Sequence, residues 1–144
     1  VKNAMRQALL LYCKDKDVNF HWLRAYYIYG DDMRGSSIFA KLCQAEEDGK
    51  EEFPFTSGKN KYDFIHVDEL AKQIELASVQ DKVNGVINVC TGQPMTLAEK
   101  VESYIKEHNF KIRLKYGAFP DRPYDSPGEW GDATLINQIM ENAK

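Results

Sequence analysis

The chain has 144 residues, of which 43% are hydrophobic, and this is enough for one domain with a packed core. Its 19 basic and 22 acidic residues leave a net charge of −3, which offers no basic surface for nucleic acid or an anionic membrane. No apolar run is long enough to span a bilayer and no signal-peptide pattern opens the chain, so we expect a cytoplasmic protein.

The first half of the chain alternates helical and extended patterns. Apolar residues at three- and four-residue spacing predict a helix over residues 2–14. The aromatic-rich stretch 19–27 is typical of a buried strand. A polar loop begins at Gly30, and Ser36 is predicted to cap a following helix that ends at Gly49.

The stretch from Lys61 to Leu70 joins a strand to a helix within ten residues. Its first part, 62–65, is rich in β-forming residues, whereas the part after Asp68 has helical periodicity. Before this junction, a short strand is predicted in 52–58, and its Pro54 favours an edge position.

The last third repeats the alternation. The apolar run 86–90 predicts a strand covered on both faces. Thr96 and Glu99 form a T-x-x-E capping box at the start of the next helix. A strand follows at 111–116, the Pro-, Gly- and Asp-rich stretch 117–132 predicts a loop, and a last helix starts after it.

Helices and strands that alternate in this way predict an α/β fold with some parallel pairing. The chain begins and ends within helical patterns and has no capping residue before the first helix, so we expect it to be a piece of a longer protein.

The cysteines and histidines do not form a recognisable site. Cys13, Cys43 and Cys90 are odd in number, widely spaced and without a C-x-x-C motif, which predicts free thiols in a reducing compartment. The three histidines do not have a metal-ligand pattern, so no metal is expected, and His66 is interpreted as a structural residue bonded to backbone.

Four stretches, LRAYYIYGDD, YDFIHVDELA, GVINVCTGQPMTLAE and FPDRPYD, occur in the order found in one enzyme family. They resemble the NAD-dependent epimerase/dehydratase family, the extended short-chain dehydrogenases that act on nucleotide sugars. The resemblance implies the C-terminal part of a Rossmann-type parallel sheet plus a small α/β substrate-binding domain. Residues 1–30 would be a remnant of the nucleotide-binding domain, and 31–144 the substrate-binding domain, with strand 86–90 returning to the Rossmann sheet.

The same resemblance implies a catalytic lysine. The spacing to Arg24 matches Lys2 to the lysine of the family's Tyr-x-x-x-Lys pair, and the tyrosine would precede Val1. Such a lysine holds the ribose hydroxyls of NAD or NADP and lowers the pKa of the tyrosine that acts as base. Tyr26 and Tyr27 would lie at the nicotinamide and the sugar. The glycine-rich loop that binds the cofactor would also lie upstream. We therefore expect no cofactor to bind these 144 residues alone.

The resemblance also implies a nucleotide-sugar substrate. A homo-oligomer is expected because, without the upstream strands of the sheet, the strand at 20–26 would present an unpaired edge. Five residues are matched to its substrate contacts: Tyr27, Phe53, Phe55, Tyr62 and Arg122. Arg122 would bind the diphosphate, for which a guanidinium offers fork-shaped donors.

Two of these matches depart from the family pattern, because Tyr27 stands where Asn is usual and Tyr62 where Arg often contacts phosphate. Ala25 likewise replaces a usual Pro. Two alternatives stay open. One is a non-catalytic α/β binding or interaction module, which would explain the missing glycine-rich loop. The other, left open by the departures at Tyr27 and Tyr62, is a family reductase that acts on a non-sugar carbonyl.

Overall fold

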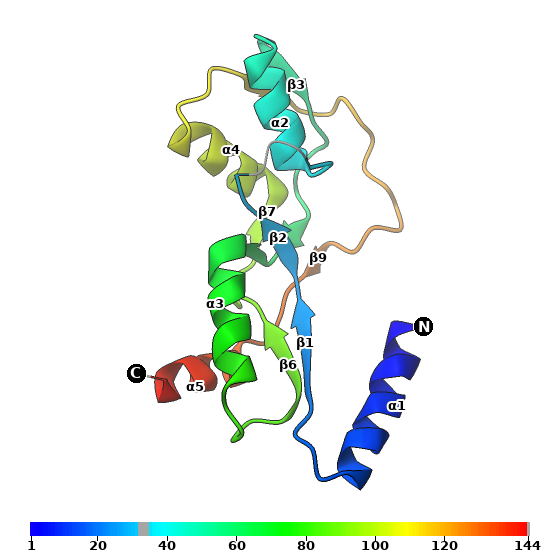
Figure 1. Ribbon diagram of the computed structural model, residues 1–144. Helices are drawn as coiled ribbons and strands as arrows, with labels where there is room; N and C mark the ends of the chain where they lie inside the picture. Colours follow the sequence, from blue (N-terminus) through cyan, green and yellow to red (C-terminus); the bar gives the residue numbers. More distant parts are fainter. Residues whose placement is uncertain (32–34, 144) are drawn as a thin grey trace.

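The computed structural model describes residues 1–31 and 35–143, which form five helices and nine short strands (Figure 1). The helices are α1 (Lys2–Asp15), α2 (Ile38–Glu47), α3 (Val67–Ser78), α4 (Leu97–Glu107) and α5 (Thr134–Asn142). The strands are β1 (His21–Ala25), β2 (Tyr27–Tyr29), β3 (Glu52–Pro54), β4 (Lys61–Tyr62), β5 (Phe64–His66), β6 (Gly85–Val89), β7 (Met95–Thr96), β8 (Arg113–Lys115) and β9 (Gly128–Glu129).

The strands pair in four small sheets. Parallel pairs join β1 to β6, β2 to β5 and β3 to β8. The fourth sheet has the order β7-β4-β9, in which β4 runs antiparallel to β7 and parallel to β9. The predicted α/β fold with parallel pairing is therefore confirmed.

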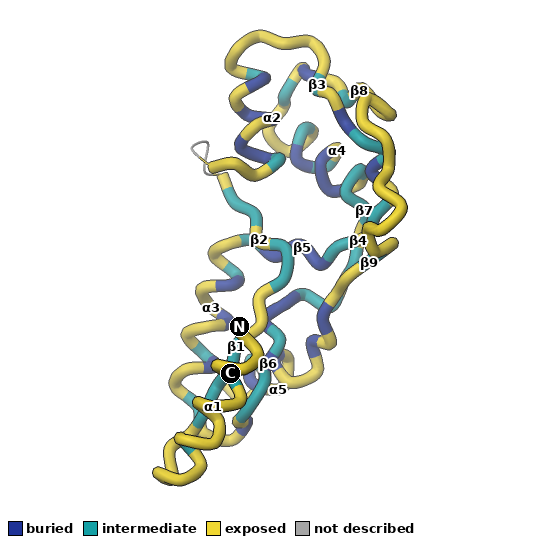
Figure 2. The backbone as a smooth tube through the Cα atoms, turned by 90° about the vertical axis from the view of Figure 1, so that its right-hand side faces the viewer, coloured by how far each residue is buried: buried dark blue, intermediate teal, exposed yellow. Residues whose placement is uncertain are grey.

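Two hydrophobic clusters lie at opposite ends of an elongated molecule (Figures 1 and 2). The first, here the α3/α5 cluster, is built on Ile87, Val89 and Ile136 from β6 and α5, with Leu70 and Ala77 of α3. The second, here the α2/α4 cluster, contains the fully buried residues Phe39, Leu42, Val101, Tyr104 and Ile112.

Adjacent residues of β5 contribute to different clusters, because successive side chains of a strand point to opposite faces. Phe64 belongs to the α2/α4 cluster and Ile65 to the α3/α5 cluster. Likewise, Tyr26 packs against the α3/α5 cluster and Tyr27 against the α2/α4 cluster. The chain therefore passes from one cluster to the other at each of these two places.

At both of these places the strand boundaries differ from those predicted from the sequence. The single buried strand predicted at 19–27 is wrong: it breaks at Tyr26 into β1 and β2, which lie in different sheets and are half-buried or exposed. The strand predicted at 62–65 breaks at Asp63 into β4 and β5. In each case the chain changes sheet within one residue. At Tyr26 the run of β-forming residues carries no mark of this change, whereas at Asp63 a single acid interrupts it.

The helix caps were predicted more accurately. The capping box of Thr96 and Glu99 is confirmed at the start of α4. The cap of α2 is Ser37 rather than Ser36, since the Ser37 hydroxyl accepts the backbone N–H of Ala40. His66 caps α3, its Nδ1 accepting the N–H of Asp68 at 3.3 Å, so its structural role is confirmed.

Helix α1 stands apart from both clusters (Figure 1). None of its residues is buried, and Met5, Leu11 and Tyr12 are more than half exposed. Within the described residues, no helix combines the length and apolar character needed to cross a membrane.

Candidate functional site

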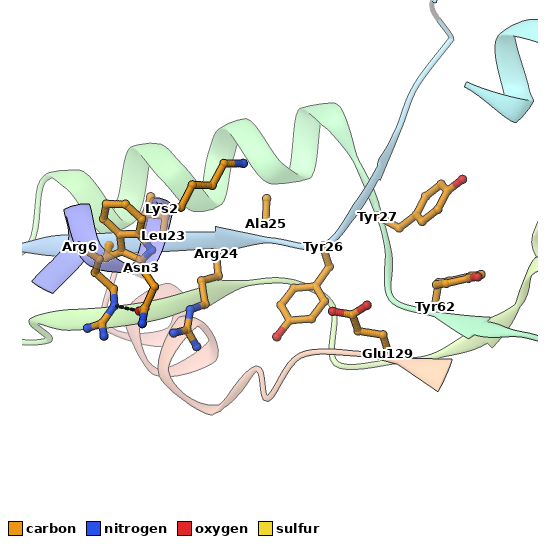
Figure 3. Close-up of a pocket in the computed structure, with 11 residues that line it drawn as sticks. Lys2, Asn3, Arg6, Leu23, Arg24, Ala25, Tyr26, Tyr27, Tyr62 and Glu129 are labelled. Atoms are coloured by element: carbon orange, nitrogen blue, oxygen red, sulfur yellow. Dashed lines mark hydrogen bonds between the residues drawn. The ribbon is translucent and has the colours of Figure 1, made fainter. Parts of the chain in front are cut away.

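A cleft of about 900 Å³ lies where α1, β1, β4 and β9 approach one another (Figure 3). Its lining residues come from segments far apart in the sequence, namely Lys2, Asn3, Arg6, Trp22, Leu23, Arg24, Ala25, Tyr26, Tyr27, Tyr62 and Glu129. Four of the seven residues matched to the family's site therefore line one cleft: Lys2, Tyr26, Tyr27 and Tyr62.

The other three matched residues are placed elsewhere. Among the described residues, Phe53, Phe55 and Arg122 do not line the cleft. Phe55 is 2% exposed within the α2/α4 cluster and meets the Tyr116 ring edge-on, with 5.5 Å between ring centroids. Arg122 lies in the exposed connection between β8 and β9. This connection is attached to the segment before β4 by the Asp121 carboxylate, which accepts the N–H of Ser57.

Aromatic rings form one wall of the cleft. The Tyr27 and Tyr62 ring centroids are 5.3 Å apart, and Phe64 supports Tyr27 with a centroid distance of 4.9 Å. Burial raises the pKa of Tyr27, and the neighbouring Tyr62 raises it further. The Tyr27 phenol therefore stays protonated at neutral pH and can donate a hydrogen bond.

Tyr26 points to the other side of the chain, toward β6 and β9 (Figure 3). Glycine at position 131 allows this packing, because a Cβ there would lie 2.6 Å from the Cys90 sulfur and 2.7 Å from the Tyr26 ring. Burial is the main cause of a raised Tyr26 pKa, with Cys90 and Glu129 adding to it and Arg24 opposing it. Burial also raises the pKa of Cys90 to about 11, so this thiol is inert at neutral pH.

The residues that line the cleft carry a net positive charge, whereas the whole chain carries a net negative charge. Lys2, Arg6 and Arg24 contribute three cations and Glu129 one anion, whereas the whole chain carries −3. Arg6 is oriented by Asn3 on the same helix, with 3.1 Å between Nε and Oδ1. The three cations give this side of the cleft the donors that a diphosphate-bearing ligand requires.

Asp63, which the sequence did not single out, holds the frame of the cleft together. Its side chain is completely buried. One carboxylate oxygen accepts the N–H and the hydroxyl of Thr91 at 2.9 and 2.6 Å. The other accepts the N–H groups of Gly92 and Gly131 at 2.8 and 3.3 Å.

The backbone of the same residue makes two more hydrogen bonds. Its carbonyl accepts the N–H of Tyr27 at 3.0 Å, and its own N–H donates to the carbonyl of Glu129 at 3.2 Å. The chain also passes between the two clusters in residues 90–97 and 114–133. Asp63 bonds to both of these segments and to Tyr27, and it thereby fixes the backbone beside Tyr27 and Glu129. The signal in the sequence was a lone acid between Tyr62 and Phe64 in a β-forming run, a position that requires buried hydrogen-bond donors.

Comparison with known proteins gives one family. Residues 1–90 match the NAD dependent epimerase/dehydratase family. A dTDP-6-deoxy-L-talose 4-dehydrogenase (NAD(+)) of Aggregatibacter actinomycetemcomitans is 44% identical over 131 residues, which are 90% of this chain and 48% of that protein. The chain therefore spans about half the length of this curated relative.

Solved structures of sugar-nucleotide enzymes have the same fold. The UDP-N-acetylglucosamine 4-epimerase of Methanobrevibacter ruminantium, in complex with UDP-N-acetylmuramic acid, matches with a TM-score of 0.79 and 25% identity, over 96% of this chain and 45% of that one. The UDP-glucose 4-epimerase of Thermus thermophilus, in complex with NAD, matches with a TM-score of 0.74 and 19% identity, over 97% and 45% of the two chains.

Proposed function

Because the chain belongs to the NAD-dependent epimerase/dehydratase family, we propose that it supplies the substrate-facing part of an enzyme that moves a hydride between NAD and a nucleotide sugar. The proposal rests on one observation: Lys2 of α1 lines the same cleft as Tyr26, Tyr27 and Tyr62. In this proposal residues 1–30 belong to the nucleotide-binding domain and 31–144 to the substrate-binding domain, with strand 86–90 returning to the Rossmann sheet.

Within the family, a dehydrogenase is the class we favour. The relative that is 44% identical is a 4-dehydrogenase of a dTDP-6-deoxy sugar that uses NAD, whereas the epimerase structures are 25% identical or less. We infer a nucleotide-linked hexose as substrate, oxidised or reduced at a ring carbon.

The residues of the cleft fit a dinucleotide cofactor. Lys2, Arg6 and Arg24 offer cationic donors, and Tyr26 offers a flat aromatic face beside Arg24 (Figure 3). Lys2 would hold the ribose hydroxyls at the nicotinamide end, next to Tyr26 and Tyr27. When bound, NAD supplies the hydride chemistry, and the protein supplies binding and orientation.

The chain's own groups would then act on protons and position. The Lys2 ammonium favours the charged form of a nearby phenol, so it would lower the pKa of a tyrosine one helical turn before it, which takes the proton from the sugar hydroxyl. Tyr27, which stays protonated, would donate a hydrogen bond to the sugar. The Tyr27–Tyr62 ring pair would form the apolar wall at this end of the cleft.

The nucleotide end of the substrate would extend past Tyr62 toward β3 and the β8–β9 connection. There Phe53 would flank the base and Arg122 would bind the diphosphate, whereas Phe55, which the sequence matched to the same contact, is buried and would only support this wall from the α2/α4 cluster. In the full-length protein, Arg122→Ala should raise the Michaelis constant for the nucleotide sugar, with a loss of about 1.5–3 kcal/mol for a charged hydrogen bond. Arg113→Ala, on β8, is the matched control. An unchanged constant, with Tyr62→Ala harmful instead, would place the phosphate contact at β4.

The proposal as a whole is tested by Lys2→Met in the full-length protein. Turnover should fall by about 100- to 10,000-fold, the contribution of general acid–base catalysis. The fold should be unaffected, since Lys2 is exposed on a helix without buried residues. Lys14→Met on the same helix is the control and should retain activity. Wild-type turnover in Lys2→Met would contradict the assignment.

A further inference from the structure

Glu129 is the single carboxylate that lines the cleft among the described residues. No described residue donates a hydrogen bond to this carboxylate or forms an ion pair with it. Every other charged residue of the lining is a cation, so Glu129 places a localised negative charge at one point of a positively charged cleft.

The position of Glu129 is fixed by its backbone. It pairs with Tyr62 in the β4–β9 ladder, and its carbonyl accepts the N–H of the buried Asp63 at 3.2 Å. Two residues further on, the N–H of Gly131 bonds to the Asp63 carboxylate. These contacts fix the backbone of Glu129 before any ligand arrives, so only its side chain has to be ordered when a ligand binds, which limits the entropic cost of binding.

The surroundings of Glu129 suit the sugar more than the phosphates. Figure 3 shows its carboxylate beside the Tyr26 ring, with Arg24 on one side and Tyr62 on the other. In the proposed function the cofactor lies toward Lys2 and the nucleotide beyond Tyr62, so the sugar ring occupies the space between. Tyr26, whose raised pKa keeps it protonated, adds a phenol donor next to the Glu129 acceptor.

We propose that Glu129 is a specificity-determining residue that accepts hydrogen bonds from hydroxyls of the sugar ring and selects neutral hexoses over uronic acids. This inference rests on the proposed function. A carboxylate accepts from hydroxyl donors with charge-assisted hydrogen bonds. It repels a second carboxylate in a cleft that a bound substrate closes from water. The same residue therefore favours one substrate class and rejects the other.

The test is a comparison of dissociation constants in the full-length protein, with wild type, Glu129→Gln and the control Glu75→Gln, an exposed residue of α3. The probes are dTDP-glucose, UDP-glucose, UDP-glucuronate and the bare diphosphates dTDP and UDP. In Glu129→Gln we expect the preference for UDP-glucose over UDP-glucuronate to fall by about 10-fold or more. The affinity for the bare diphosphates and all constants of Glu75→Gln should stay unchanged.

Three results would count against the inference, and each is distinct from the others. If the nucleotide sugars bind but Glu129→Gln keeps the wild-type preference, Glu129 does not determine specificity, whereas the proposed function stands. If neither the sugars nor the diphosphates bind wild type, the proposed function fails and the inference with it. A loss of dTDP affinity in Glu129→Gln equal to the loss for dTDP-glucose would also overturn it, because the residue would then act on the nucleotide end.

Discussion

A carboxylate removed from water is stable only where hydrogen-bond donors replace the lost hydration. Asp63 has four such donors, three backbone N–H groups and one hydroxyl, supplied by residues 91–92 and by Gly131. Because Asp63 follows Tyr62 and Gly131 lies two residues after Glu129, both of which line the cleft, we expect a change at this side chain to move the cleft as well as the core.

We therefore predict that Asp63→Asn lowers the free energy of unfolding by about 2–4 kcal/mol. The amide nitrogen that replaces one carboxylate oxygen would face N–H donors, and at least one of them would be left without an acceptor. Urea denaturation of the full-length protein measures the change. Asp81→Asn, in an exposed turn, is the matched control, and an equally small effect of both substitutions would contradict the role of Asp63.

Individual residues differ in how far the sequence could predict them. His66 was predicted as a structural residue because its partners are local backbone groups, and it caps α3. Asp63 was missed because its donors lie about 30 and 70 positions further along the chain, and only the folded chain brings them together. Lys2 was matched to the cleft through the family resemblance, since an exposed lysine near the start of a helix has no distinguishing local pattern.

Among the elements, α4 has the most strongly specified start. The Thr96 hydroxyl accepts the N–H of Glu99, and the Glu99 carboxylate accepts the N–H and hydroxyl of Thr96 at 2.8 Å each. These bonds from Thr96 lower the pKa of Glu99. The helix start is therefore stabilised by a carboxylate that keeps its charge to lower pH than a free glutamate does.

Removing this cap should have a measurable cost. Thr96→Ala is expected to lower the free energy of unfolding by about 1 kcal/mol, the usual effect of losing an N-cap hydroxyl. Glu99→Gln removes only the charge, and its effect should depend on pH. The folded-state pKa of Glu99 lies below its unfolded value, so the charge stabilises the fold above the unfolded pKa and this stabilisation is lost as pH falls through the folded pKa.

Denaturation of wild type and Glu99→Gln from pH 7 down to pH 3 measures this dependence. The difference between them should be constant near neutrality and shrink toward zero in acid. Glu47→Gln, at the exposed end of α2, should show no such pH-dependent difference. A Glu99→Gln difference that grows in acid would mean that the carboxylate does not stabilise the cap.

Element boundaries were less predictable than element types. Turn and cap residues identified most helices, because their hydrogen bonds are local in sequence. The break at Tyr26 was not predicted, since a strand that leaves one sheet for another keeps the same β-forming residues. The break at Asp63 was marked only by a single acid within such a run. Strand β9 was assigned to a loop for a related reason: Gly128 and Glu129 have low strand propensity, and they pair because β4 lies beside them.

The whole molecule exposes surfaces that are suited to association. Among the described residues β1 pairs only with β6, so its other edge has unpaired backbone groups. Beside it, α1 exposes Met5, Leu9, Leu11 and Tyr12. An unpaired edge next to an apolar helix face favours pairing with another chain.

We predict that the 144-residue chain self-associates through this edge or through α1. Light scattering over a dilution series should give a mass above that of one chain, falling as the protein is diluted. Substituting Leu11 and Tyr12 with Ser should shift the equilibrium toward the monomer if α1 is responsible, with Val79→Ser in an exposed turn as the control. A monomer at every concentration, with cooperative unfolding, would contradict the prediction.

Four segments of the chain cross between the α3/α5 and α2/α4 clusters, and Asp63 lies on one of them while bonding to the other three. A joint with one crossing behaves as a hinge, but a joint with four crossings tied at one point resists both bending and twisting. The two clusters should therefore move as one rigid unit, without a hinge motion that closes one toward the other. A single peptide cut in the exposed stretch 117–127 would leave them fastened to each other, because three crossings would remain beside the one that was severed.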